Sequence, residues 1–138
     1  MIQINVQTIE DIPVARVKSE HGIAGSKKAF DLLESRMNGL TGRKMFGVFY
    51  PQSDEYFACV LLDEQFPDDM GFERGSIPGG KYARQRLEGW SSKIPQIKTT
   101  FDQLEQAIAD NKLEIDPVRP SIEYYRSFRE LICMLPVR

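Results

Sequence analysis

The sequence predicts a single α+β domain, residues 1–138, in which two pseudo-symmetric β-α-β-β modules form one antiparallel sheet with two helices on one face. Three observations carry this prediction: strand-like alternation in both halves of the chain, two helical stripes of apolar residues, and short motifs that recur between the halves. The 138 residues, of which 41% are hydrophobic and 28% charged, suit one globular domain with a real core.

Four strands are predicted in the first half of the chain. Residues 2–7 and 14–18 alternate apolar and polar side chains with a period of two, which is typical of half-buried strands. Two further strands are predicted at residues 44–50 and 55–62, on either side of the turn at residues 51–54.

Two helices are predicted from apolar residues that recur at helical spacing. The stripe of the first helix consists of Phe30, Leu33, Met37 and Leu40. The stripe of the second helix consists of Ile94, Ile97, Phe101, Leu104 and Ile108. Ser26 is the predicted N-cap of the first helix. If both stripes cover the same face of the sheet, the opposite face is free to form a ligand groove.

The second half repeats this order of elements. After a loop at residues 65–71, strands are predicted at residues 72–77 and 81–87, before the second helix. Two more strands close the chain at residues 121–125 and 131–137.

Short motifs recur between the two halves. Residues 30–34 and 101–105 are identical at four of five positions, with an offset of 71. The other matches, with offsets of 65 and 74, are Ile12-Pro13 with Ile77-Pro78, Tyr50 with Tyr124, and Cys59 with Cys133. Offsets that grow along the chain are what small loop insertions produce in a duplicated unit. We therefore predict an internal duplication with units at about residues 11–64 and 77–138.

Charge and composition narrow the classes of partner. The formal net charge of −2 argues against nucleic acid, because phosphate binding needs an excess of Lys and Arg on one face. No apolar run approaches the roughly 20 residues that cross a bilayer, and the first residues lack the features of a signal peptide. We expect a cytoplasmic protein, a monomer or weak homodimer, with neither a nucleic acid nor a membrane as partner.

Neither a metal site nor a cofactor is predicted. Cys59 and Cys133 lie far apart in apolar runs, where a cysteine usually behaves as a small buried hydrophobe. With the single His21 they do not complete a zinc site without several carboxylates. Gly79-Gly80 lacks the lysine pattern of a phosphate-binding loop, so a nucleotide site is not expected.

Glu123 is the strongest candidate for a functional residue. It lies in the apolar, aromatic run at residues 121–125, where a carboxylate is expensive to bury. The equivalent position of the first unit, at an offset of 74, is Phe49, so only one unit carries the charge. Two interpretations stay open: a glutamate of an edge strand that points into solvent, or a desolvated carboxylate that meets a ligand.

Aromatic and polarisable side chains are the candidate walls of such a site. They are Tyr50, Tyr56, Tyr82, Trp90, Tyr125, Phe128 and Met134. Strand alternation places Glu123 and Tyr125 on one face of the sheet and Tyr124 on the other. Tyrosine and tryptophan rings around an organic cation each contribute about 0.5–2 kcal/mol.

The chain resembles the GyrI-like, or AraC-type effector-binding, family of small-molecule-binding domains. The residues that carry the resemblance are Ile12 to Val17, Gly79 to Ala83, Gly89, Glu123, Tyr125, and Leu135 to Val137. The resemblance implies two β-α-β-β modules and a glutamate at the base of a pocket for cationic, lipophilic ligands, which maps onto Glu123. Residues 63–71 match poorly, so the pocket rim does not carry over. The chain has no room for a helix-turn-helix segment, so we expect a stand-alone member that does not itself bind DNA.

Three functions follow as alternatives. The first is a sensor or sequestering protein for small lipophilic, possibly cationic, organic molecules. The second is a hydrolase of strained electrophilic small molecules, which the resemblance implies for some stand-alone members; here Glu123 would be the general base, with Tyr125 or Tyr50 as its partner. The third is a protein-binding inhibitor that uses an exposed surface. A close set of the Glu123 carboxylate, a tyrosine hydroxyl and a water would favour hydrolysis, whereas a pocket that carries Glu123 without them would favour simple binding.

Overall fold

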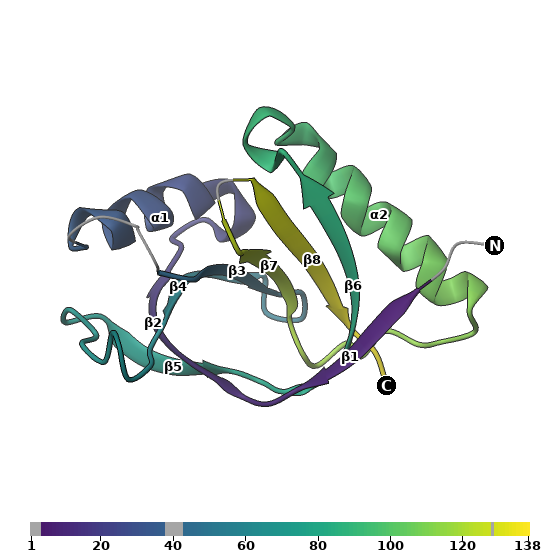
Figure 1. The fold of residues 1–138 in the computed structure, drawn as a ribbon, viewed down its shortest axis with the longest axis horizontal. Helices are drawn as coiled ribbons and strands as arrows, with labels where there is room; N and C mark the ends of the chain where they lie inside the picture. The colour runs from purple at the N-terminus through teal and green to yellow at the C-terminus, as the bar shows by residue number, and fades with distance from the viewer. Residues whose placement is uncertain (1–3, 38–42, 128) are drawn as a thin grey trace.

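The computed structural model describes residues 4–37, 43–127 and 129–138, which form one curled antiparallel sheet with two helices (Figure 1). The strands are β1 Asn5–Ile9, β2 Ile12–Lys18, β3 Met45–Tyr50, β4 Glu55–Leu61, β5 Glu73–Ile77, β6 Gly80–Glu88, β7 Ser121–Tyr125 and β8 Glu130–Pro136. The helices are α1 Ser26–Ser35 and α2 Pro95–Asp110, with short 3-10 helices η1 Gly22–Gly25 and η2 Trp90–Ser92. None of the helices in the described ranges is long and apolar enough to span a bilayer.

The sheet order is β1-β6-β8-β7-β3-β4-β2-β5, and every neighbouring pair is antiparallel. Along the chain, β2-α1-β3-β4 is followed by β6-α2-β7-β8, and β3 meets β7 in the middle of the sheet. The strand before each series pairs with the other series, because β1 lies on β6 and β5 lies on β2. The two series are therefore interlocked.

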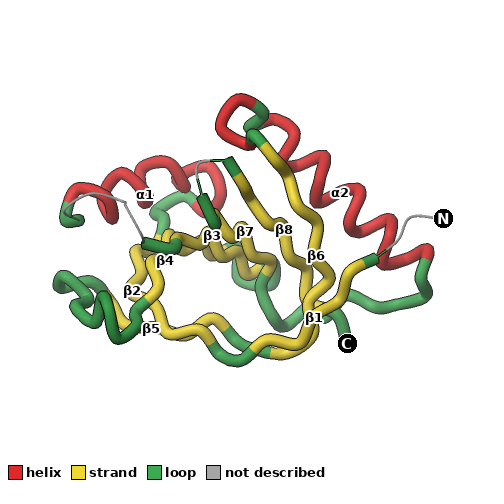
Figure 2. The backbone as a smooth tube through the Cα atoms, in the orientation of Figure 1, coloured by secondary structure: helices red, strands yellow, loops and turns green. Residues whose placement is uncertain are grey.

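A long two-stranded ribbon, made of β1 and β2 paired with β6 and β5, closes the open side of the curl. The pairs Ile9 with Gly80 and Ile12 with Ile77 belong to one uninterrupted register across the β1–β2 connection. Figure 2 shows this ribbon along the lower edge of the molecule, opposite the helices. Where the two segments of the ribbon meet at their turns, the backbone N–H of Gly79 donates to Asp11 Oδ1 at 2.6 Å.

The pairing within the ribbon shows that one predicted match between the two halves was wrong. Ile12 begins β2, whereas Ile77 ends β5, and the two residues are paired across the ribbon. Ile12-Pro13 and Ile77-Pro78 therefore do not occupy corresponding places in the order of elements, and their offset of 65 is no sign of a repeat.

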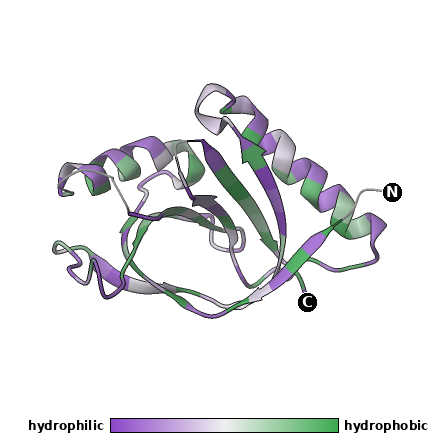
Figure 3. Cartoon of the chain, in the orientation of Figure 1, coloured by the Kyte–Doolittle hydropathy of each residue, from purple (hydrophilic) through white to green (hydrophobic). Residues whose placement is uncertain are grey.

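Both helices cover the same face of the sheet, as predicted. Ala29 and Leu33 of α1 are buried in a cluster with Ala58 and Val60 of β4. Leu104 and Ile108 of α2 are buried in a cluster with Ala83 of β6 and Leu135 of β8. The strand register joins these positions into one face, because Ala58 is paired with Gly47, Gly47 with Glu123, and Glu123 with Cys133. Figure 3 shows apolar and polar residues alternating along each helix.

The helix stripes were predicted correctly except at their ends. Leu33 and Met37 are buried, and Phe30 is half-buried, whereas Leu40 lies outside the described residues. Ser26 is the first residue of α1 rather than its N-cap; that position belongs to Gly25, which offers no side-chain hydrogen bond. Pro95 is the first residue of α2, where a missing backbone N–H costs nothing.

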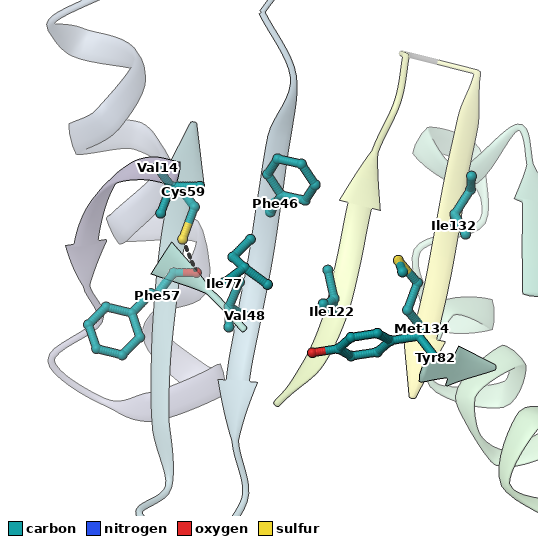
Figure 4. Packing of buried hydrophobic residues seen from close by; sticks show 10 residues of the cluster. All are labelled: Val14, Phe46, Val48, Phe57, Cys59, Ile77, Tyr82, Ile122, Ile132 and Met134. Carbon is teal, nitrogen blue, oxygen red and sulfur yellow. Dashed lines mark hydrogen bonds between the residues drawn. The ribbon is translucent and has the colours of Figure 1, made fainter. Parts of the chain in front are cut away.

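The face opposite the helices is packed, which corrects the prediction of an open groove there. Side chains of the central strands meet side chains of the ribbon in one buried cluster (Figure 4). Its buried members are Val14, Phe46, Val48, Phe57, Cys59, Ile77, Tyr82, Ile122, Ile132 and Met134. The groove was expected because no helix covers this face, but the ribbon covers it instead and removes its apolar surface from water.

Candidate functional site

Glu123 lies at the centre of β7, on the face that carries the two helices. Its Cα partners are Gly47 of β3 and Cys133 of β8, so strands flank it on both sides. The side chain is half-buried, which excludes the interpretation of an edge-strand glutamate in bulk solvent. The shared face of Glu123 and Tyr125 is confirmed, because the two side chains are hydrogen-bonded.

Two tyrosine hydroxyls donate to the same carboxylate oxygen. Tyr56 Oη lies 2.5 Å from Glu123 Oε1, and Tyr125 Oη lies 3.2 Å from that atom. Tyr56 comes from β4, two strands away from Glu123, and its side chain is buried. Within residues 4–37, 43–127 and 129–138, no donor reaches Glu123 Oε2. One oxygen is thus fixed by the protein, and the other remains free to accept a hydrogen bond.

Gly47 makes this arrangement possible. It is the Cα partner of Glu123 in β3, and a Cβ atom at this position would overlap both Tyr56 Oη and Glu123 Oε1. A glycine inside a strand often marks the close approach of another group. Here the two groups are the hydroxyl and the carboxylate of the hydrogen-bonded pair.

The environment of Glu123 favours its neutral form. Burial raises the pKa of the Glu123 carboxyl, and the hydrogen bonds from Tyr56 and Tyr125 lower it by a smaller amount. No Lys or Arg of the described ranges forms an ion pair with Glu123. The charge of the carboxylate is therefore stabilised by two neutral donors alone.

Both tyrosines stay protonated. Burial and the neighbouring Glu123 charge raise the pKa of Tyr56 well above its ordinary value, and the same two causes raise the pKa of Tyr125. Burial, followed by the charge of Glu123, also raises the pKa of the Cys133 thiol to about 12, so this cysteine is not a nucleophile at neutral pH. The site thus offers phenol donors beside a single titrating carboxyl.

Two further aromatic rings contact Tyr125. The Tyr125 ring makes edge-to-face contacts with Phe30 of α1, at 5.6 Å between centroids, and with Trp90 of η2, at 4.9 Å. Trp90 Nε1 donates to the carbonyl oxygen of Ser127 at 2.9 Å, which ties η2 to the β7–β8 connection. Phe30, Trp90 and Tyr125 are all half-buried.

The structure brings together only some of the predicted site residues. Glu123, Tyr56, Tyr125 and Trp90 form one group, which with Phe30 and Gly47 we call the Glu123 cluster. Tyr50, Tyr82 and Met134 belong to the packed face on the other side of the sheet, so their prediction as neighbours of Glu123 was wrong. Phe128 lies outside the described residues.

Sequence reasoning missed two members of the cluster. Phe30 was read only as part of the helical stripe, although it sits at the edge of that stripe and is less buried than Leu33. Gly47 carried a usable signal, since a glycine inside an otherwise apolar strand suggests a close contact. Its consequence depends on the register of β3 with β7, which no local pattern gives.

No metal centre accompanies the cluster: over the described ranges, no three His, Cys, Asp or Glu side chains come together in a way that could hold an ion. A hollow of about 390 Å³ lies elsewhere, at the C-terminal end of α2, between Ile108, Leu113 and Ile115. It contains neither an aromatic ring nor a buried charge, so the Glu123 cluster is the better candidate for chemistry.

Comparisons with known proteins find this fold in solved structures. The C-terminal domain of EcmrR superposes with a TM-score of 0.71 at 12% identity, over 99% of this chain and 97% of that one. The structure of SAV2435 bound to tetraphenylphosphonium gives a TM-score of 0.60 at 16% identity, over 99% of this chain and 94% of that one. A hydrolase encoded by lin2189 from Listeria innocua gives 0.60 at 13% identity, over 99% and 92%.

The chain shares the fold of these proteins, and at such low identity the likeness extends to the fold alone. No family model matches the chain, and no curated protein matches its sequence.

Proposed function

We propose that this protein binds small, lipophilic organic cations at the Glu123 cluster. The observation that carries the proposal is a half-buried carboxylate with two phenol donors on one oxygen and no ion-pair partner within the described ranges. A desolvated carboxylate without a cation is costly, and a bound organic cation would repay part of that cost.

The aromatic rings suit the apolar part of such a ligand. Phe30 of α1 and Trp90 of η2 both contact the ring of Tyr125, whose hydroxyl is hydrogen-bonded to Glu123. Rings of this kind attract a cation by about 0.5–2 kcal/mol each. Trp90 contacts the Tyr125 ring directly, so a ligand that binds beside Tyr125 would also lie near the indole.

Family resemblance and fold support the same function. We infer membership of the GyrI-like family from the sequence motifs, and a protein of this fold, SAV2435, was solved with the lipophilic cation tetraphenylphosphonium. A sensor or sequestering role in the cytoplasm, as a monomer or weak homodimer, fits this proposal and requires neither a nucleic acid nor a membrane as partner.

We also infer that the two interlocked series of elements derive from one duplicated unit. The helices support this, because buried positions recur at an offset of 71. These positions are Ala29 with Thr100, Leu33 with Leu104, and Met37 with Ile108. Only the second series supplies a glutamate to the site, so the duplicated framework would hold an asymmetric ligand position.

The test is isothermal titration with tetraphenylphosphonium and with a protonated naphthylmethyl amine, using neutral triphenylphosphine oxide for comparison. Glu123→Gln removes the charge and keeps the shape. Glu34→Gln, at an exposed position of α1, makes the same change in net charge away from the site. We expect cation binding to weaken by about tenfold or more in Glu123→Gln, as expected when one partner of a desolvated charge pair is lost, and to be unchanged in Glu34→Gln.

The proposal fails if neither cation binds the wild type more tightly than Glu123→Gln. It also fails if the neutral oxide binds as well as tetraphenylphosphonium, since apolar contact alone would then explain the affinity.

A second function, hydrolysis of a strained electrophilic molecule, is favoured by the 2.5 Å contact between Tyr56 and Glu123. In this scheme Glu123 Oε2 takes a proton from a water, and the water oxygen bonds to the electrophilic carbon. The strained bond breaks, and its electron pair goes to the leaving carbon. This carbon then receives the proton from Glu123 Oε2. The raised pKa of Glu123 suits a general base that works near neutral pH. Tyr56 would position the carboxylate rather than react.

Turnover distinguishes the two functions. A hydrolase would convert an activated cyclopropane into its ring-opened hydration product in the presence of wild-type protein, but not of Glu123→Gln. A pure binding protein would bind cations and leave such a compound intact.

A further inference from the structure

We propose that the Glu123 cluster selects cations that carry an N–H donor over cations of equal charge that carry none. This selectivity rests on the proposed function and specifies its ligand class: protonated amines, amidines and related nitrogen bases. Quaternary ammonium and phosphonium ions would be the weaker class.

The two oxygens of the Glu123 carboxylate have different hydrogen-bond partners. Oε1 accepts hydrogen bonds from Tyr56 at 2.5 Å and from Tyr125 at 3.2 Å, which occupies its lone pairs. Gly47 leaves the room in which this oxygen and the Tyr56 hydroxyl meet. Oε1 is thereby held in place by three strands, because Gly47, Tyr56 and Tyr125 come from β3, β4 and β7.

Oε2 is the oxygen that a ligand would meet. No residue of the described ranges donates to it, although the carboxylate is half-buried. Oε2 is thus a partly desolvated acceptor without a protein donor, and an N–H group of the ligand would meet it with a short, charge-assisted hydrogen bond. A quaternary cation has no hydrogen to donate, and its alkyl groups would keep its charge farther from the oxygen.

The rest of the site does not distinguish cations that carry an N–H group from cations that carry none. Attraction to the faces of Trp90 and Tyr125 depends on the charge of the ligand and not on an N–H group. Apolar burial of the ligand skeleton is the same when the skeleton is the same. A difference in affinity between matched ligands therefore reports on Oε2.

The experiment uses two ligands that differ by one methyl group: N,N-dimethyl(naphthylmethyl)amine, which is protonated at neutral pH, and trimethyl(naphthylmethyl)ammonium. Both are titrated calorimetrically into wild type, Glu123→Gln and the charge-matched control Glu34→Gln. We expect the protonated amine to bind wild type and Glu34→Gln about tenfold more tightly than the quaternary ion, the fold-change of one net hydrogen bond to a charged group.

Glu123→Gln should abolish this preference. The two tyrosine hydroxyls require an acceptor at the Oε1 position, so the amide nitrogen of glutamine would take the place of Oε2 and present donors to the ligand. Circular dichroism and the unfolding midpoint of the variant check that the fold is intact.

The outcomes separate this inference from the proposed function. Equal affinity for both ligands, with both depending on Glu123, overturns the selectivity and leaves the cation site in place. A preference that persists unchanged in Glu123→Gln also overturns it, because the extra methyl group alone would then explain the difference. If neither ligand depends on Glu123, the proposed function itself fails.

Discussion

Glu123 is a residue whose burial disfavours its charged form. Burial raises the pKa of its carboxyl, and two hydrogen bonds from tyrosine compensate only in part. Proteins that hold such groups usually use them, because a less costly residue would serve the core as well. Phe49 on the neighbouring strand shows that this face of the sheet accepts an aromatic side chain.

Glu123→Gln is expected to change how stability depends on pH. Because the pKa of Glu123 is raised in the folded state, its proton stabilises the fold fully below the ordinary carboxyl pKa. That stabilisation is lost as the pH rises through the raised pKa. Glutamine is neutral at every pH. The free energy of unfolding of the variant, relative to that of the wild type, should therefore increase from acidic to neutral pH, and the variant should be the more stable protein at neutral pH.

Urea unfolding of both proteins across this pH range measures the effect, with Glu34→Gln as the control for net charge. A free-energy difference between wild type and Glu123→Gln that stays constant with pH would contradict the expectation.

Gly47→Ala should damage the site and the fold together. The new methyl group would overlap Tyr56 Oη and Glu123 Oε1, so one of the two side chains must move. We expect a loss of about 1–3 kcal/mol in the free energy of unfolding, the usual cost of overpacking, and weaker cation binding. Denaturant unfolding and titration with tetraphenylphosphonium measure the two effects. Wild-type stability combined with wild-type affinity would show that the packing around Glu123 is looser than described.

At the scale of elements, local patterns predict the strands well, because alternation is a short-range signal. The strand at residues 121–125 coincides with β7, and the predicted strand at residues 131–137 is displaced by one residue from β8. The first strand is less accurate: it was predicted at residues 2–7, and β1 is Asn5–Ile9. None of its residues is buried, so its position is set by pairing with β6 and not by its own pattern.

The ribbon depends on a close crossing of two chain segments at Gly79. A Cβ atom there would lie 2.6 Å from the carbonyl oxygen of Ile9 and 2.9 Å from the backbone nitrogen of Asp11. Because these are backbone atoms of a paired segment, they cannot move aside cheaply. Gly79→Ala should therefore lower the free energy of unfolding by about 1–3 kcal/mol or more.

Ser76→Ala, at an exposed position of β5, is the matched control and should stay within about 0.5 kcal/mol of the wild type. Guanidinium unfolding compares the three proteins. Equal midpoints for Gly79→Ala and Ser76→Ala would mean that the crossing is not tight.

At the scale of the whole molecule, the sequence could not say which face of the sheet holds the site. Alternation places Glu123 and Tyr125 together but does not reveal on which side the helices lie. Tyr50, Tyr82 and Met134 were assigned to the same site because all are aromatic or polarisable, and the strand register separates them from it. The ribbon, which fills the predicted groove, arises from pairs such as Asn5 with Arg84, far apart in the sequence.

The interlocked order of strands predicts that neither half of the chain folds alone. β1 needs β6 and β5 needs β2, so a chain divided in the connection between β4 and β5 would leave each fragment with an unpaired strand. Fragments 1–67 and 68–138 should each lack cooperative unfolding, and a mixture of the two should regain it. Circular dichroism of the separate and mixed fragments tests this, and a cooperative transition in one isolated fragment would contradict it.

Trp90 is the only tryptophan of the sequence, and within the Glu123 cluster its ring contacts that of Tyr125. The intrinsic fluorescence of the protein therefore comes from the candidate site itself. Indole emission shifts with the polarity around the ring, so any molecule that moves Trp90 from Tyr125 would change the emission wavelength. The protein carries its own optical reporter, and a library of compounds can be screened against it without attaching a dye.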